Sequence, residues 1–214
     1  ALGLVLAVGG VSSVAFFADR VRQALTREAH QVLGADLLMT ADHAWSSEFR
    51  DEIVRQGLAR ADSVNFVSMA RAGNEALLAA VKAVTPGYPL RGKLRIAPGL
   101  NTAGADTDSI PPRGSVWLDE RMMAALKVGP GDAVELGNAR LLVGAVLTLE
   151  PDRGVSFMNF APRVMMQIDD LPATGLVQPG SRINYQLLAA GEREKVQRFE
   201  QWARARLGRG ERVD

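Results

Sequence analysis

The sequence predicts an α+β fold. Patterns typical of strands and of helices mix along the chain, without the regular alternation that produces a doubly wound parallel sheet. The composition of the 214 residues, 47% hydrophobic and 23% charged, is that of an ordinary globular domain. No internal repeat is clear enough to indicate a solenoid or a propeller.

The chain opens on eighteen residues without a charged side chain. A membrane-spanning helix needs about 20 apolar residues, whereas a signal peptide needs a basic start and a small residue where Phe16 stands. We expect residues 1–18 to be the end of a transmembrane helix, with a buried core helix as the alternative. Helical spacing continues past Asp19, and Gly34 can end the helix. One nearly continuous helix is therefore expected over residues 9–33.

The remaining elements follow from local patterns. Short apolar or alternating runs predict strands at residues 35–40, 64–69, 77–84, 93–96, 115–118, 163–167 and 183–188. A helix is expected after the capping pair Ser46 and Ser47, and another over Glu120–Leu126 behind the cap residue Asp119. At the C-terminal end, one helix face is expected to carry Val196, Phe199, Ala203 and Leu207.

Turn signals divide the middle of the chain. The polar stretch 101–113 is rich in Gly, Asp, Thr and Pro, which indicates a loop or a boundary between lobes. Gly137 and Asn138 stand between VEL and ARLLVGAVL, which is a strong signal for a two-residue hairpin. This middle region is expected to be small and rich in β-structure.

Composition and motifs argue against an enzyme and against cofactors. There is no cysteine, and the net charge of +1 argues against a nucleic-acid partner. No phosphate-binding loop, nucleophile elbow or HExxH motif is present. The few possible ligands or acids are expected to have structural roles: His30 as a surface residue, His43 with Asp42 and the pair Asp106 and Asp108 as loop residues, and the pair Asp169 and Asp170 as turn and helix-cap residues.

One segment is more suggestive of function. The stretch GVSFMNFAP (154–162) places apolar side chains between loop signals. Apolar groups on an exposed loop often mark a binding site, and methionine adapts to varied apolar surfaces. We expect Phe157, Met158 and Phe160 to contact hydrophobic cargo or a partner protein. The alternative is a loop folded over the core, with these side chains buried.

Four runs of residues together resemble a known family. VSSVAFFADRVRQAL through LGADLL resembles the exit of the first membrane span in FtsX/MacB-type ABC permeases, and VWLDERMMAALKVGPGDAVELGNARLLVGAVL resembles the middle of their periplasmic core domain. With RGVSFMNFAPRVMM and DDLPATGLVQPGSRINYQLL added, the chain is most similar to the YbbP-like branch of these permeases. The resemblance covers nearly the whole chain.

The resemblance implies a domain on the outer side of the bacterial inner membrane, facing the periplasm. It implies a porter-like α+β lobe over residues 19–98 and 163–214, with a small β-rich lobe over residues 99–162. It also implies an ATPase on a separate cytoplasmic subunit, a possible periplasmic partner protein, and hydrophobic or lipid-like cargo. A membrane-anchored periplasmic binding or adaptor domain without a transport role remains the alternative.

Overall fold

The computed structural model describes residues 34–153, 161–178 and 180–213. In chain order the elements are β1 (Leu37–Ala41), α2 (Ser47–Arg55), β2 (Ala59–Ala72), β3 (Glu75–Val84), β4 (Leu94–Ala97), β5 (Ala105–Thr107), β6 (Ser115–Asp119), α3 (Glu120–Leu126), β7 (Ala133–Leu136), β8 (Ala139–Leu149), β9 (Arg163–Gln167), the 3₁₀ turn η2 (Ile168–Asp170), α4 (Leu171–Thr174), β10 (Asn184–Ala190), α5 (Arg193–Arg204) and β11 (Glu211–Val213). The α+β class is confirmed.

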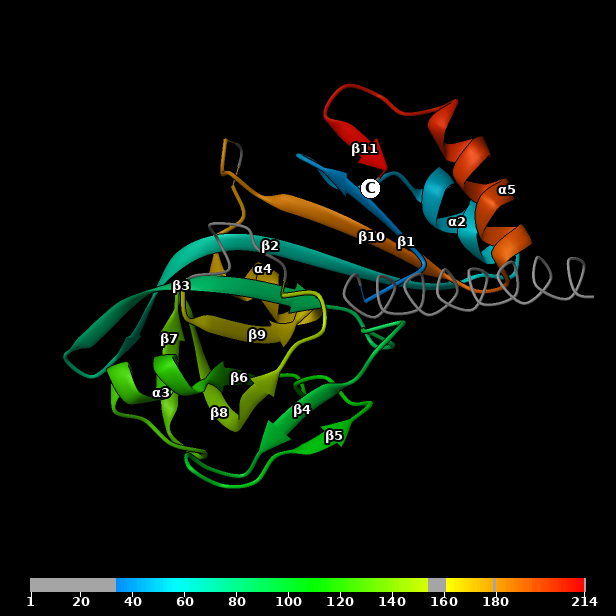
Figure 1. Cartoon of the computed structure of the whole chain (residues 1–214). Coiled ribbons are helices and arrows are strands. Elements are labelled where there is room, and N and C mark those ends of the chain that lie inside the picture. Colours follow the sequence, from blue (N-terminus) through cyan, green and yellow to red (C-terminus); the bar gives the residue numbers. More distant parts are fainter. Residues whose placement is uncertain (1–33, 154–160, 179, 214) are drawn as a thin grey trace, which may run out of the picture.

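The strands of these residues form one mixed sheet. Their order is β11-β1-β10-β2-β3-β9-β6-β8-β4-β5, and β7 pairs with both β2 and β8. Neighbouring strands run antiparallel except in the pairs β3–β9 and β6–β8. The long hairpin of β2 and β3 connects the end that carries α2 and α5 to the end that carries α3 (Figure 1). Distant parts of the chain are therefore joined by continuous backbone pairing.

Two of the apolar clusters lie at opposite ends of this sheet. At one end, α2 and α5 pack on the side of β1 and β10 that carries Leu37, Met39 and Leu187. At the other end, α3 contributes Met122, Met123 and Leu126 to a cluster with β6, β8 and β9. Three of the four residues of the predicted apolar face of the last helix are confirmed, because Val196, Phe199 and Ala203 are buried in the first of these clusters. The fourth, Leu207, lies beyond the end of α5 and packs against the same cluster from the following loop.

Local capping and turn chemistry set several element boundaries. The backbone N–H of Met122 donates to the Asp119 carboxylate at 2.9 Å, which confirms the predicted cap of α3. The predicted hairpin at Gly137 is also confirmed, since Leu136 pairs with Ala139 across it. Gly137 has φ +57°, and a Cβ there would overlap the carbonyl oxygen of Thr174. This turn therefore requires glycine for both conformation and space.

The structure departs from the sequence-based expectation in several places. Ser46 stands at the N-cap of α2, but its side chain makes no capping hydrogen bond. The stretch 101–113 contains the short strand β5, which pairs with β4. Asp170 precedes α4 without capping it by its side chain. Its carboxylate instead accepts a 2.7 Å hydrogen bond from the backbone N–H of Gly114 and so ties two distant loops together.

Other expectations are not tested by this fold. The helix predicted over residues 9–33, with the membrane end at 1–18 and His30, lies outside the described residues. Within the part of the chain that the structure describes, no helix is long and apolar enough to cross a membrane. The division into lobes at 19–98, 99–162 and 163–214 stays a prediction.

Candidate functional site

The predicted contact residues Phe157, Met158 and Phe160 lie outside the described residues, so the structure places only the two ends of their segment. Arg153 donates to the Asp119 carboxylate at 2.8 Å and to the carbonyl oxygen of Ala161 at 3.4 Å. On the far side, the carbonyl oxygen of Pro162 accepts from the backbone N–H of Ala80 at 2.8 Å. Both ends are thus fixed to the sheet, and they are held close to each other.

Behind these ends lies a buried network of charged side chains. Lys82 Nζ lies 3.0 Å from a Glu150 oxygen and 2.6 Å from an Asp152 oxygen, and Arg163 Nε lies 2.8 Å from the other Glu150 oxygen. The Tyr88 hydroxyl donates to the second Asp152 oxygen. We call these five residues the buried charge network.

The protonation states in this network follow from its pairing. Burial by itself raises the pKa of Glu150, but the positive charges of Lys82 and Arg163 outweigh burial and hold that pKa below its usual value of 4.5. Burial, reinforced by the nearby carboxylates of Asp152 and Glu150, raises the pKa of Tyr88 well above its usual value. Glu150 is therefore ionised and Tyr88 protonated at neutral pH. Two cations face two anions, as buried charges require.

The buried charge network also reaches the start of the described chain. Gly34 lies beside Asp152, since a Cβ added at Gly34 would be in ordinary van der Waals contact with the Asp152 Cβ, at 3.4 Å. The carbonyl oxygen of Gly34 accepts from the Arg91 backbone at 2.9 Å, and the Arg91 side chain pairs with Asp36. The entry of the chain into the sheet and both ends of the segment 154–160 therefore lie near the buried charge network, and each is held by its own polar contacts.

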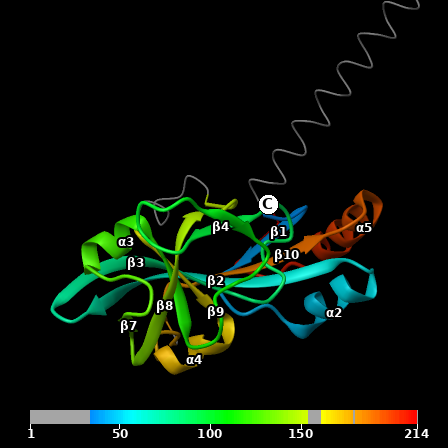
Figure 2. The same cartoon turned by 90° about the horizontal axis from the view of Figure 1, so that it is seen from below.

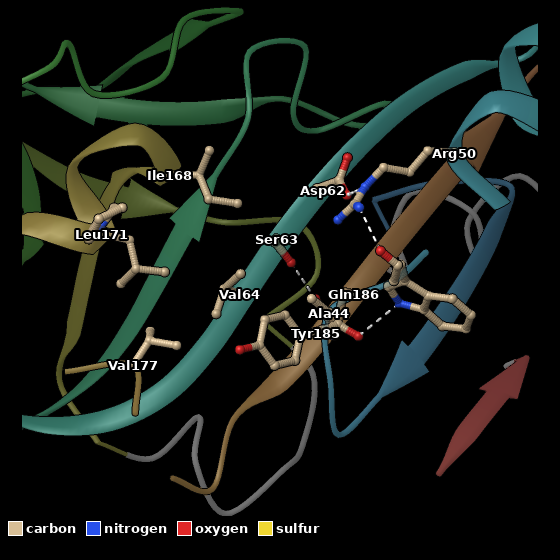
Figure 3. Close-up of a pocket in the computed structure, with 12 residues that line it drawn as sticks. Ala44, Arg50, Asp62, Ser63, Val64, Ile168, Leu171, Val177, Tyr185 and Gln186 are labelled. Atoms are coloured by element: carbon tan, nitrogen blue, oxygen red, sulfur yellow. Dashed lines mark hydrogen bonds and ion pairs between the residues drawn. The ribbon is translucent and has the colours of Figure 1, made fainter. Parts of the chain in front are cut away.

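The second feature is a groove on the face of the sheet between α2 and α4. It encloses about 370 Å³, and Figure 3 shows Ile168, Leu171 and Val177 on one side of it, with Arg50 and Asp62 across from them. The remaining lining residues come from the loop before α2, from β2, α4 and β10: Ala44, Trp45, Ser63, Val64, Pro172, Tyr185 and Gln186. Figure 2 shows α2 and α4 on the same side of the sheet.

The polar atoms of the groove are arranged by short hydrogen bonds. Arg50 donates from Nε to Asp62 at 2.7 Å and from a terminal nitrogen to the carbonyl oxygen of Trp45 at 2.6 Å. The indole N–H of Trp45 donates to the carbonyl oxygen of Tyr185 at 3.2 Å, which fixes the ring beside β10. These contacts position one guanidinium at the rim of an otherwise largely apolar hollow. We call this hollow the α2–α4 groove.

The sequence reasoning missed both features, although the sequence does carry a signal for the buried charge network. Lys82 stands alone in the apolar run LLAAVKAV and Arg163 opens the apolar run RVMM, and a lone charge in a buried strand implies a buried partner. For the groove, no comparable signal exists. Arg50, Ile168 and Tyr185 are far apart in sequence and look like ordinary helix, turn and strand residues.

Several of the polar residues singled out from the sequence have partners within the described part of the chain. His43 lies between Asp42, at 2.8 Å, and Glu211 of β11, at 3.2 Å. Asp106 pairs with Arg95, and Asp108 pairs with Lys93. In the described ranges there is no group of three or more His, Cys, Asp or Glu side chains that could hold a metal ion.

Comparison with known proteins identifies the class. Residues 1–206 match the family model described as MacB-like periplasmic core domain. The chain is 32% identical over 202 residues to the uncharacterized ABC transporter permease YbbP of Escherichia coli (strain K12). That alignment covers 94% of this chain and 24% of the relative, so the chain spans less than a quarter of the relative's length.

Two solved structures share the fold. The extracellular domain of the noncanonic ABC-type transporter YknZ from Gram-positive bacteria has a TM-score of 0.51 at 14% identity, covering 83% of this chain and 99% of that one. The periplasmic region of MacB from Actinobacillus actinomycetemcomitans has a TM-score of 0.50 at 12% identity, covering 86% and 91%. At these identities the likeness shows the fold alone.

These findings define a periplasmic domain of a membrane permease, which is a non-catalytic class of protein. The chain belongs to the MacB-like periplasmic core domain family. The family predicted from the four sequence runs is thereby confirmed.

Proposed function

We propose that this domain serves a bacterial inner-membrane ABC permease, in which it couples cytoplasmic ATP hydrolysis to the handling or export of hydrophobic, lipid-like cargo. The ATPase would be a separate cytoplasmic subunit that contacts the rest of the permease. A periplasmic protein would be a further partner. The domain itself would face the periplasm, with residues 1–18 as the end of the first membrane span.

The observation that carries this proposal is the buried charge network. A domain that transmits motion from a membrane span must connect that span stiffly to the surface that acts on cargo. Gly34, the first described residue after the predicted span, lies beside Asp152, and the same network fixes Arg163 just after the segment 154–160. Each buried charge of the network faces a charge of opposite sign, although one Glu150 oxygen has only the ion pair with Lys82 and no hydrogen bond. Paired buried charges favour one geometry over its alternatives, which suits a rigid link of this kind.

The proposed contact residues fit this arrangement. Arg153 and Pro162 hold the ends of the segment against Asp119 and the backbone of Ala80, so a contact made by Phe157, Met158 or Phe160 would be made from a firmly held base. Two phenylalanine side chains left in water cost roughly 1.5–3 kcal/mol each relative to burial. A compensating role in binding is therefore expected.

Reconstitution of the complete permease tests the proposal. The intact protein, expressed from its full gene, is purified together with any ATPase that co-purifies and is inserted into lipid vesicles. We expect ATP hydrolysis, and ATP-dependent transfer of a fluorescent fatty acid from the vesicles to albumin outside. If no ATPase co-purifies with the permease and no ATP-dependent lipid transfer occurs, the result would instead support the alternative of a membrane-anchored binding or adaptor domain.

A further inference from the structure

The α2–α4 groove has the size of a small-molecule site. Its volume of about 370 Å³ lies at the lower end of the range for ligand pockets, which is about 300–1,000 Å³. One wall is apolar: Leu171 is nearly buried, Ile168 is half-buried, and Val177 is 38% exposed. An exposed valine beside a hollow is apolar surface that a ligand would cover.

The opposite wall carries a positive charge. The Asp62 carboxylate lies 2.7 Å from Arg50 and 3.3 Å from Arg60. Two guanidinium groups thus share one carboxylate and together leave an excess of one positive charge, although Arg60 itself does not line the groove. The Arg50 side chain is 32% exposed, and only part of its hydrogen-bonding capacity is used by Asp62 and the Trp45 carbonyl. A guanidinium in this setting favours a carboxylate, which it binds through a planar pair of N–H groups.

Between the two walls, the floor of the groove is compatible with an apolar chain. Val64 and Tyr185 contribute apolar surface, and Ser63 donates to the Gln186 side chain at 2.7 Å, so these two polar groups already pair with each other. Figure 3 shows the floor residues Val64 and Tyr185 between the apolar side and Arg50. The groove thus presents the Arg50–Asp62 pair at one end, with further N–H groups of Arg50 free to donate, and mostly hydrocarbon contact along the rest.

We propose that the α2–α4 groove binds a single-chain amphiphile with a carboxylate head, such as a fatty acid. The head pairs with Arg50, and the chain lies against Ile168, Leu171 and Val177. This assignment rests on the proposed function, because it names the class of hydrophobic cargo. The small volume favours one chain over the two chains of a phospholipid, and the excess positive charge disfavours a cationic amphiphile.

Photolabelling tests this assignment directly. The 214-residue chain is held in nanodiscs of zwitterionic phosphatidylcholine, and dodecanoate with a terminal diazirine is crosslinked by light and located by mass spectrometry. We expect labelled peptides that contain Ile168 to Val177 or Tyr185. Unlabelled dodecanoate should compete. Dodecyltrimethylammonium, of equal chain length but opposite charge, should compete at least tenfold more weakly, because it lacks the pairing with Arg50.

Two variants with matched controls separate binding from folding. Arg50→Gln should weaken competition by dodecanoate roughly tenfold or more, because a charged hydrogen bond is lost, whereas Arg204→Gln on the exposed face of α5 should leave it unchanged. Val177→Asp places a negative charge on an exposed position of the apolar wall and should weaken it similarly. Val54→Asp makes the same change at a 60% exposed position outside the groove and should have no effect.

The outcomes discriminate between the two proposals. Labelling confined to residues 1–33, equal competition by the cationic amphiphile, or equal effects of the two valine variants would each overturn the groove assignment. ATP-dependent lipid transfer without groove labelling would leave the proposed function standing and remove the site. Groove labelling without ATP-dependent transfer would keep the site and remove the proposed function.

Discussion

Carboxylates and cations meet in two regions of this molecule, with different surroundings. In the buried charge network, the side chains of Lys82 and Glu150 are 3% and 0% exposed. At the α2–α4 groove, the Arg50 side chain is 32% exposed and lies beside a cavity of about 370 Å³. A desolvated pair resists any change of partner, whereas a guanidinium at the edge of a cavity can accept a second anion. The first region is thus suited to rigidity and the second to binding.

Removing one cation from the buried charge network should have the largest effect on stability. Lys82→Met leaves Asp152 with only the Tyr88 hydroxyl and Glu150 with only Arg163 among the contacts described above. Because an uncompensated buried charge remains, we expect the free energy of unfolding to fall by about 3–5 kcal/mol. Urea denaturation measures this.

The matched control is Lys93→Met, since Lys93 pairs with Asp108 at an exposed position. It should cost no more than about 1 kcal/mol. Adding Asp152→Asn to Lys82→Met should recover part of the loss, because one unpaired charge is removed. Equal losses for Lys82→Met and Lys93→Met would erase the distinction between buried and exposed pairs.

Substituting Asp119 should have a smaller effect on stability, and its two contacts can be tested separately. One of its oxygens caps α3 through the Met122 N–H, and the other pairs with Arg153. Asp119→Ala should lose both contacts, at roughly 2 kcal/mol, whereas Asp119→Asn keeps a capping oxygen and should lose about half as much. Thermal unfolding of both variants is the measurement, and an alanine variant no less stable than the asparagine variant would show that the cap contributes nothing.

Much of the fold was predictable from sequence, because its signals are local. Asp119 precedes a helix that it caps, and Gly137 and Asn138 stand between two strands that then pair. The sheet order was not predictable, since the parallel pairing of β3 with β9 joins residues about eighty positions apart. The groove could not be predicted for the same reason. Its apolar wall comes from η2, α4 and Val177 after α4, whereas its guanidinium comes from α2, and only the tertiary fold brings them together.

Substituting the predicted contact residues should impair function and leave stability almost unchanged, which is the opposite of the effect expected for Lys82. Phe157→Ala combined with Phe160→Ala should change the melting temperature little if these side chains act in binding, and should abolish ATP-dependent lipid transfer by the complete permease. If the side chains belong to the core, each substitution should cost about 3–5 kcal/mol instead. A stable double variant with full transfer activity would rule out the contact role, and so would a variant that fails to fold.

The smallest expected effect is local and concerns His43, which is about half exposed between Asp42 and Glu211. Hydrogen bonds that the His43 ring donates to the two carboxylates, the larger contribution coming from Asp42, raise the pKa of His43 above its usual value of 6.5. Because the folded-state pKa is raised, the stabilisation that protonated His43 contributes to β11 is complete below pH 6.5 and is lost as pH rises through the folded-state pKa.

Hydrogen exchange measures this effect. After correction for the intrinsic pH dependence of exchange, the backbone amides of Arg212 and Val213 should be less protected above that pKa than below pH 6.5. His43→Asn should remove this pH dependence, while exchange in β3 around Lys82 should not respond to either change, since its charges are buried and paired. Matching pH dependences in β11 and β3 would mean that the exposed and buried charges act as one unit, contrary to the difference in their surroundings.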